Sequence, residues 1–277
     1  MWLNDLDVHV EIDGRGPPLL LLHGFTGSVR AWDAVRPALA EFATVISIDL
    51  IGHGRTAAPE EASRYSLDWS ARDLVALLDG LQLDAIDVLG YSMGGRVALH
   101  LAVHAPARVK TLILESASPG IEDDPERHRR VESDAALAQR IVEHGIEAFV
   151  AEWERLPLLA PAPHVPESER ARHTTQRLHN NPLGLANSLR GMGAGQQTPL
   201  WPVLPALEQR VLLIVGERDT RYRQMAERMH ALVPASEVAV VADAGHTVHV
   251  DAPQAFVALV KSAWSNSQAE AGKARST

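Results

Sequence analysis

Short apolar runs rich in branched side chains alternate along the 277-residue chain with longer segments of helical spacing. The runs are typical of buried strands and cover residues 19–22, 44–48, 85–89, 109–114, 211–215 and 237–241. The helical segments cover residues 66–81, 94–103, 222–232 and 253–264. Because strands that alternate with helices pair in parallel, we predict an α/β protein with a mostly parallel central sheet and helices on both faces. An antiparallel opening strand is predicted where Val8, Val10 and Ile12 alternate with polar residues.

The alternation stops between about residues 119 and 207, where Arg, His, Glu and helix formers dominate. Four helices are predicted there, at residues 125–144, 145–155, 167–179 and 182–190. We expect them to form a helical cap insertion over the carboxyl edge of the sheet. The chain is therefore predicted to be one domain over residues 1–264, with a core at about 1–118 and 208–264 and a cap at about 119–207. Residues 265–277, where only Ala is apolar, are predicted to be a disordered tail.

The composition excludes several classes of function. Apolar residues make up 46% of the chain, as in an ordinary globular protein with a substantial core. The formal net charge of −9 opposes binding to nucleic acid or to an anionic membrane surface. The absence of cysteine excludes disulfides, thiol nucleophiles and Cys-ligated zinc. No stretch has the ~20 apolar residues of a membrane-spanning helix and no signal peptide is recognisable, so we expect a cytoplasmic protein.

Ser92 has the sequence context of a catalytic residue. It lies in residues 90–95 (Gly-Tyr-Ser-Met-Gly-Gly), directly after one predicted strand and at the start of a predicted helix. A nucleophile elbow needs small residues on both sides of its serine, because the turn is strained and the helix packs tightly on the strand. The turn also places the N–H of Met93 where it can face a developing oxyanion. The alternative is a Gly-rich turn with an incidental serine.

Two partners for Ser92 follow in the chain order Ser, acid, His that is typical of the α/β-hydrolase fold. Asp219 and His246 each lie in the loop after a predicted strand. His246 can accept the Ser92 proton while Asp219 orients the imidazole. Asp243 is a rival acid, but its position suggests a turn residue instead. A second oxyanion donor, the N–H of Phe25, is expected from the loop at residues 22–27 after the first core strand.

The sequence predicts no metal site and no cofactor. His100 and His104 have the i, i+4 spacing of a helical zinc pair, but Leu101 stands where a metalloprotease carries Glu. With no third ligand evident, we expect both to be ordinary helix residues. The glycines at residues 191–195 have the wrong spacing for a dinucleotide-binding loop, and no phosphate-binding loop is present.

Arginines are concentrated in the predicted cap and near Ser92. Such guanidinium groups could bind a substrate with several carboxylates, or they could pair with neighbouring Glu and Asp on a solvated face. The group comprises Arg96, Arg127, Arg129, Arg130, Arg170, Arg172, Arg177 and Arg190.

Motifs along nearly the whole chain resemble one family of this fold. They lie at residues 23–28, 90–96, 114–121, 180–186, 188–193 and 245–249, with further matches at Glu126, Arg127, Arg130, Phe149, Trp153 and Pro157. Together they resemble the MenH family, the 2-succinyl-6-hydroxy-2,4-cyclohexadiene-1-carboxylate synthases of menaquinone biosynthesis. The Ser92 and His246 motifs belong to the fold at large, and the cap motifs are the specific part.

The resemblance implies a lyase that eliminates pyruvate from 2-succinyl-5-enolpyruvyl-6-hydroxy-3-cyclohexene-1-carboxylate, a small molecule with three carboxylates. It implies that Ser92 takes a ring proton as a base and that the N–H groups of Phe25 and Met93 stabilise an enolate-like intermediate. The positions that match the family's substrate-binding residues are Arg96, Arg130, Arg177, Tyr91 and Trp153, with Arg127 a close rival to Arg130.

One position departs from the family. Some members carry Tyr after the cap tryptophan, where this chain has Glu154. A carboxylate would repel a tri-anionic substrate, so we expect Glu154 to point away. The sequence also leaves open a serine esterase or carbon–carbon bond hydrolase of the same fold, and a non-catalytic ligand-binding protein. It does not decide between a monomer and a homo-oligomer.

Overall fold

A computed structural model describes the backbone of residues 1–274 and the side chains of residues 1–263. Its main sheet has seven strands in the order β3-β5-β4-β6-β7-β8-β9, and a separate hairpin joins β1 to β2. Within the main sheet, β3 pairs antiparallel with β5 and the other neighbours pair in parallel. The strands are β1 (Trp2–Leu3), β2 (Leu6–Asp7), β3 (Val10–Gly14), β4 (Pro18–Leu22), β5 (Thr44–Ile48), β6 (Ile86–Tyr91), β7 (Val109–Glu115), β8 (Arg210–Gly216) and β9 (Ser236–Val241).

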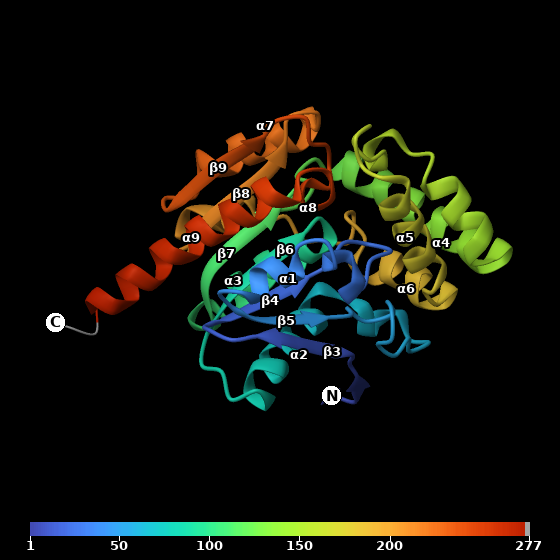
Figure 1. The fold of residues 1–277 in the computed structure, drawn as a ribbon. Coiled ribbons are helices and arrows are strands. Elements are labelled where there is room, and N and C mark those ends of the chain that lie inside the picture. The colour runs from blue at the N-terminus through green and yellow to red at the C-terminus, as the bar shows by residue number, and fades with distance from the viewer. Residues whose placement is uncertain (275–277) are drawn as a thin grey trace.

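Helices cover both faces of this sheet, as Figure 1 shows. The core helices are α1 (Arg36–Ala40), α2 (Leu67–Gly80), α3 (Met93–His104), α7 (Thr220–His230), α8 (Val248–Asp251) and α9 (Pro253–Ala274). The cap helices are α4 (Asp124–Trp153), α5 (Glu167–Leu178) and α6 (Pro182–Met192), all between β7 and β8. Short 3-10 helices are η1 (Val29–Trp32), η2 (Ala62–Tyr65), η3 (Pro106–Arg108), η4 (Pro157–Leu159) and η5 (Trp201–Ala206). No helix in the described part of the chain is both long and apolar enough to span a membrane.

The predicted strands and helices are confirmed, with two differences. The helices predicted at residues 125–144 and 145–155 form one element, α4, with a break at Gly145, and the last helix is longer than predicted. The helix α9 continues to Ala274, whereas the sequence predicts a disordered tail from residue 265. Residues 265–274 contain Ala, Gln, Glu and Lys, which have high helix propensity and can extend a helix that has already formed. The last part of that prediction, residues 275–277, lies outside the described residues.

The core lies in two apolar layers, one on each face of the sheet. Successive side chains of a strand point to opposite faces, so Leu20 and Leu22 join one layer while Leu19 and Leu21 join the other. All four are completely buried. Burying one such side chain contributes about 1.5–3 kcal/mol, so the strand that leads to the site is held on both sides.

The cap has a small apolar core of its own, built mainly from α4 and α6. It includes Ile141, Phe149, Leu185 and Leu189, and Phe25 from the core domain packs against it. The helix α4 is interrupted at Gly145, whose φ of 81° and ψ of 177° would strain any residue with a side chain. In Figure 1 the three cap helices are grouped at one end of the sheet.

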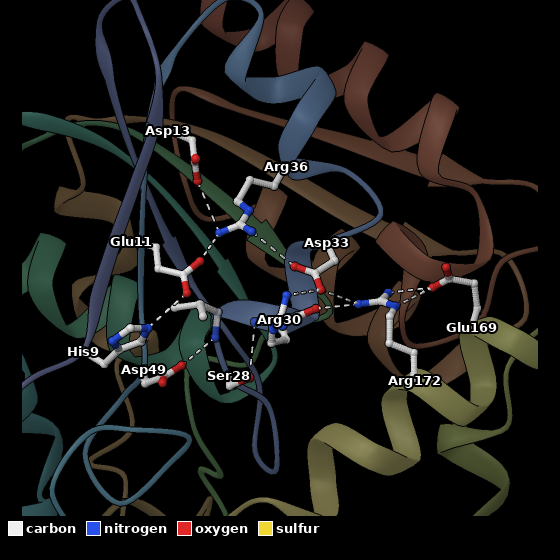
Figure 2. A network of polar contacts seen from close by, with 11 residues as sticks. His9, Glu11, Asp13, Ser28, Arg30, Asp33, Arg36, Asp49, Glu169 and Arg172 are labelled. Carbon is white, nitrogen blue, oxygen red and sulfur yellow. Dashed lines mark hydrogen bonds and ion pairs between the residues drawn. The ribbon is translucent and has the colours of Figure 1, made fainter.

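The helix α5 has no buried residue and meets the core through charged groups. Arg172 donates to the carbonyl oxygen of Arg30 at 2.8 Å and pairs with Asp33 at 3.2 Å, while Glu169 holds the same guanidinium at 2.6 Å. Figure 2 shows that Asp33 also faces Arg36, which extends the network into the core. Arg172 therefore gives α5 a charged attachment to the core, in a helix that buries no side chain completely.

Candidate active site

Ser92 lies on the sharp turn between β6 and α3, as the sequence predicts. Its φ of 50° and ψ of −107° lie outside the common regions for a residue with a side chain, a strain typical of functional turns. The turn is possible because a Cβ on Gly94 would lie 2.0 Å from the carbonyl oxygen of Leu22, so only glycine fits. The N–H of Ser92 donates to the carbonyl oxygen of Glu115 at 2.8 Å, which ties the turn to the next strand.

His246 joins Ser92 to Asp219. Its Nδ1 lies 2.7 Å from Asp219 Oδ2, and because a carboxylate only accepts, Nδ1 carries the proton. This leaves Nε2 to accept from the Ser92 hydroxyl at 3.2 Å. Asp219 is held in turn by the N–H of Tyr222 at 3.2 Å. Asp243 is exposed in a left-handed turn, so the structure places Asp219 and not Asp243 on the histidine.

The loop that carries Phe25 is fixed by His23, which belongs to the motif at residues 23–28 but to which the sequence assigned no role. His23 Nε2 accepts the N–H of Leu50 at 2.9 Å, so Nδ1–H donates to the carbonyl oxygen of Gly24 at 2.8 Å. Burial lowers the pKa of His23 to about 4, which keeps the ring neutral and this hydrogen-bond arrangement intact at neutral pH. Phe25 and Met93 both line the cavity beside Ser92, where their N–H groups are expected as oxyanion donors.

A cavity of about 170 Å³ lies between the Ser92 turn and the cap. Arg96 and Arg130 both line it, together with Ser92 and His246. Arg96 Nη1 donates to the carbonyl oxygen of Met192 at 2.6 Å. Burial lowers the pKa of Arg96 to about 10, so the group is still cationic at neutral pH. The cavity beside the serine therefore contains positive charge, although the chain as a whole is acidic.

Arg130 and Arg127, which the sequence could not separate, take different places. Arg130 Nε donates to the buried Asp134 Oδ1 at 2.8 Å, a contact that fixes the side chain at the cavity. Arg127 does not line the cavity and pairs with Asp124 at 2.5 Å. The structure thus places Arg130, and not Arg127, in the cavity that Ser92 lines. Asp134 and Arg221 are further charged lining residues that no sequence motif indicated.

Of the two predicted aromatic lining residues, only Trp153 lies at the cavity. Its ring centroid is 5.4 Å from that of Phe25. Tyr91 does not line the cavity; its hydroxyl shares a 2.8 Å hydrogen bond with the Thr247 hydroxyl and its ring packs against the other apolar layer. The reason is the alternation along β6, which turns neighbouring side chains to opposite faces. Tyr222, at a ring centroid distance of 4.6 Å from His246, also lines the cavity and was missed by the sequence motifs.

Arg177 lies at a second cavity, of about 310 Å³, which shares Leu159 with the first. Its Nη1 donates to Glu154 Oε1 at 2.8 Å, and the Thr174 hydroxyl donates to the same oxygen at 2.7 Å. Glu154 therefore points away from the Ser92 cavity, as expected. It also neutralises Arg177, which no sequence pattern indicated.

Comparisons with known proteins agree with this arrangement. Residues 17–253 match the family described as alpha/beta hydrolase fold. A protein of Bacillus subtilis (strain 168), provisionally named a 2-succinyl-6-hydroxy-2,4-cyclohexadiene-1-carboxylate synthase, is 42% identical over 91% of this chain and 93% of its own length. A synthase of that name from Enterobacter sp. (strain 638) is 31% identical over 88% of this chain and 90% of its own length.

A solved structure shows the same relationship. The structure of MenH from S. aureus superimposes with a TM-score of 0.89, at 32% identity, and covers 94% of this chain and 98% of its own. These matches extend over both core and cap, so they are not confined to the elbow that the whole fold shares. The chain belongs to the α/β-hydrolase fold family and, within it, to the MenH family of 2-succinyl-6-hydroxy-2,4-cyclohexadiene-1-carboxylate synthases.

Proposed function

We propose that this protein is a carbon–oxygen lyase of menaquinone biosynthesis. It eliminates pyruvate from 2-succinyl-5-enolpyruvyl-6-hydroxy-3-cyclohexene-1-carboxylate and forms 2-succinyl-6-hydroxy-2,4-cyclohexadiene-1-carboxylate. The observation that carries the proposal is the pair of guanidinium groups, Arg96 and Arg130, in the same cavity as the Ser92–His246 pair. A substrate with three carboxylates needs such cations, whereas a simple ester does not.

Ser92 acts as the base in this proposal. His246 accepts the hydroxyl proton, and the serine oxygen removes the proton from the ring carbon that bears the succinyl group, next to that group's ketone. The electron pair left behind forms an enolate, whose oxygen accepts hydrogen bonds from the N–H groups of Phe25 and Met93. As the enolate collapses, a double bond forms between ring carbons 2 and 3, the existing double bond moves from carbons 3 and 4 to carbons 4 and 5, and the C–O bond to the enolpyruvyl group at carbon 5 breaks. Protonated His246 returns its proton to the oxygen of that leaving group, which departs as enolpyruvate and tautomerises to pyruvate.

The guanidinium groups bind and orient the substrate. Arg96 and Arg130 approach the cavity from α3 and α4, so they can hold two carboxylates on different sides of the ring. Arg177 lies next to this cavity and can serve the third carboxylate if the substrate extends past Leu159. The proton transfers use only Ser92 and His246, and the proposal includes no cofactor, nucleic acid or membrane.

The test is pyruvate release from the enolpyruvyl cyclohexene substrate, followed with lactate dehydrogenase and NADH. The wild type should release pyruvate and Ser92→Ala should be nearly inactive, because the base is lost. Arg127→Ala, which changes an arginine outside the cavity, serves as the matched control and should keep its activity. Equal pyruvate release by wild type and Ser92→Ala would overturn the proposal.

A serine esterase or carbon–carbon bond hydrolase is the second candidate, because the contacts of Ser92, His246 and Asp219 also suit nucleophilic attack on an acyl carbon. The two candidates differ in the first intermediate. A burst of p-nitrophenol from p-nitrophenyl esters, covalent labelling by a serine-directed phosphonate and no pyruvate release would establish the hydrolase instead.

A further inference from the structure

A second cluster of chemically reactive side chains lies on α2 and α3. His100 and His104 are on the same face of α3, with ring centroids 5.2 Å apart, and Asp68 faces them from the first turn of α2. The histidines lie about 12 to 18 Å along α3 from Ser92, at a rise of about 1.5 Å per residue. Neither histidine lines the Ser92 cavity. The cluster is therefore separate from the candidate active site.

The three side chains present one nitrogen or oxygen atom each to a common point. Asp68 Oδ1 lies 3.3 Å from His104 Nε2 and 3.7 Å from His100 Nδ1, and the three ligand atoms lie within 4.8 Å of one another. Two ligands at the usual zinc distances and a tetrahedral angle are about 3.4 Å apart. The two separations from Asp68, 3.3 and 3.7 Å, are close to that value.

His100 gives an independent reason to expect a bound group. It is 4% exposed, and neither of its ring nitrogens has a hydrogen-bond partner among the described residues. Buried polar atoms normally have a partner, so an unpartnered imidazole beside two other potential ligands is unusual.

We propose that Asp68, His100 and His104 bind a divalent transition-metal ion, with Zn²⁺ the best match. Two imidazoles and one carboxylate favour zinc, cobalt, nickel or copper over magnesium and calcium, which prefer oxygen ligands. The side chains of Asp68 and His104 are 64% and 50% exposed, so solvent can supply the fourth ligand. The ion would join α2 to α3, the helix that begins directly after Ser92.

The test is a titration of untagged, chelator-free protein with Zn²⁺ in a calorimeter, with Co²⁺ absorption to report coordination geometry. The wild type should bind one equivalent of zinc, and zinc should raise its Tm. Asp68→Asn and His104→Ala should each bind at least tenfold more weakly and lose the Tm increase. Both changes are at exposed positions, and the circular dichroism of the metal-free variants should match the wild type.

The matched controls are Asp84→Asn and His128→Ala, which change an exposed aspartate and an exposed histidine elsewhere. Both should bind zinc as the wild type does. No zinc binding by the wild type, or equal binding by wild type, Asp68→Asn and His104→Ala, would refute the site. Pyruvate release by the metal-free Asp68→Asn variant should equal that of the wild type, so the outcome is independent of the proposed lyase activity.

Discussion

The two walls of the Ser92 cavity are held in place by different forces. The core wall is formed by Phe25, Ser92, Met93, Tyr222 and His246. It lies at the carboxyl edge of the sheet and is fixed by backbone hydrogen bonds and by the buried strands β4 and β6 behind it. The cap wall, formed by Arg130, Leu137, Trp153, Leu156 and Leu158, stands on helices around a small apolar cluster. Its outer helix α5 has no buried residue and depends on ion pairs.

The two walls are therefore suited to different functions. Proton transfer requires atoms held at hydrogen-bond distance, and the core wall provides that precision. Substrate choice can be altered by changing side chains alone. The cap wall tolerates such substitutions because each of its residues supports little of the buried core. Changes in the core wall should therefore act mainly on kcat, and changes in the cap should act mainly on KM.

The largest effect is expected for Ser92→Ala, which removes the base from the core wall. We expect kcat for pyruvate release to fall about 10³-fold, within the range for loss of general-base catalysis, with little change in KM. Steady-state kinetics measures both values, and urea unfolding checks that the variant is folded. A large rise in KM with unchanged kcat would contradict the division between the walls.

Removing either cavity arginine should have the next largest effect. Arg96→Ala and Arg130→Ala each lose a charge-assisted hydrogen bond to a substrate carboxylate, so kcat/KM should fall roughly tenfold or more. Arg127→Ala provides the matched control, because Arg127 belongs to the same helix as Arg130 but lies outside the cavity. If all three variants kept wild-type kinetics, Arg96 and Arg130 would not bind substrate and would only pair with neighbouring groups on a solvated face.

A smaller effect, of opposite sign, is expected for Glu154→Gln. The change removes the carboxylate that neutralises Arg177, so the guanidinium becomes available to an anionic substrate. Because the Arg177–Glu154 ion pair is partly exposed, breaking it should change the binding free energy by at most about 1 kcal/mol. KM should therefore fall by no more than about fivefold. Glu152→Gln changes an exposed glutamate in the last turn of α4, two residues before Glu154, that pairs with Arg140, and its KM should not change. A higher KM for Glu154→Gln would show that Arg177 needs its partner in order to bind.

The smallest effect is expected for Arg172→Ala, which removes the ion-pair attachment of α5 to the core. Partly exposed ion pairs contribute about 0–1 kcal/mol, so the free energy of unfolding should fall by at most about 1 kcal/mol. We expect KM to change less than about twofold, because the apolar cluster of α4 and α6 still holds the cap. Arg140→Ala removes an ion pair within the cap and is the control. A tenfold rise in KM would mean that α5 positions the whole cap wall.

The core wall could be predicted from the sequence almost completely. Its strands carry continuous apolar runs, and Ser92, Asp219 and His246 each follow a strand whose carboxyl end meets the same sheet edge. Such residues come together whatever the details of packing. The β1–β2 hairpin was not predictable in the same way, because two-residue strands have no measurable period.

The cap wall and the side-chain contacts between elements were harder to predict from the sequence. A difference of three residues on one helix decides whether Arg127 or Arg130 reaches the cavity, and helix periodicity alone does not fix that rotation. The pairing of Arg177 with Glu154 and the approach of Asp68 to His104 join separate helices, so no local pattern reports them. The alternation of β6, which packs Tyr91 against the apolar layer opposite the one that α3 covers, is likewise not visible in the motif around Ser92.

The interruption of α4 at Gly145 bears on how enzymes of other specificity could be derived from this chain. The segment before Gly145 carries Arg130 and the segment after it carries Trp153, so one pair of backbone angles sets the separation of a charged and an aromatic group that share the cavity. Ligand pockets usually enclose about 300 Å³ or more, compared with the 170 Å³ found here. Selection for larger or smaller substrates could therefore act at residue 145 and leave every atom of the Ser92, His246 and Asp219 contacts in place.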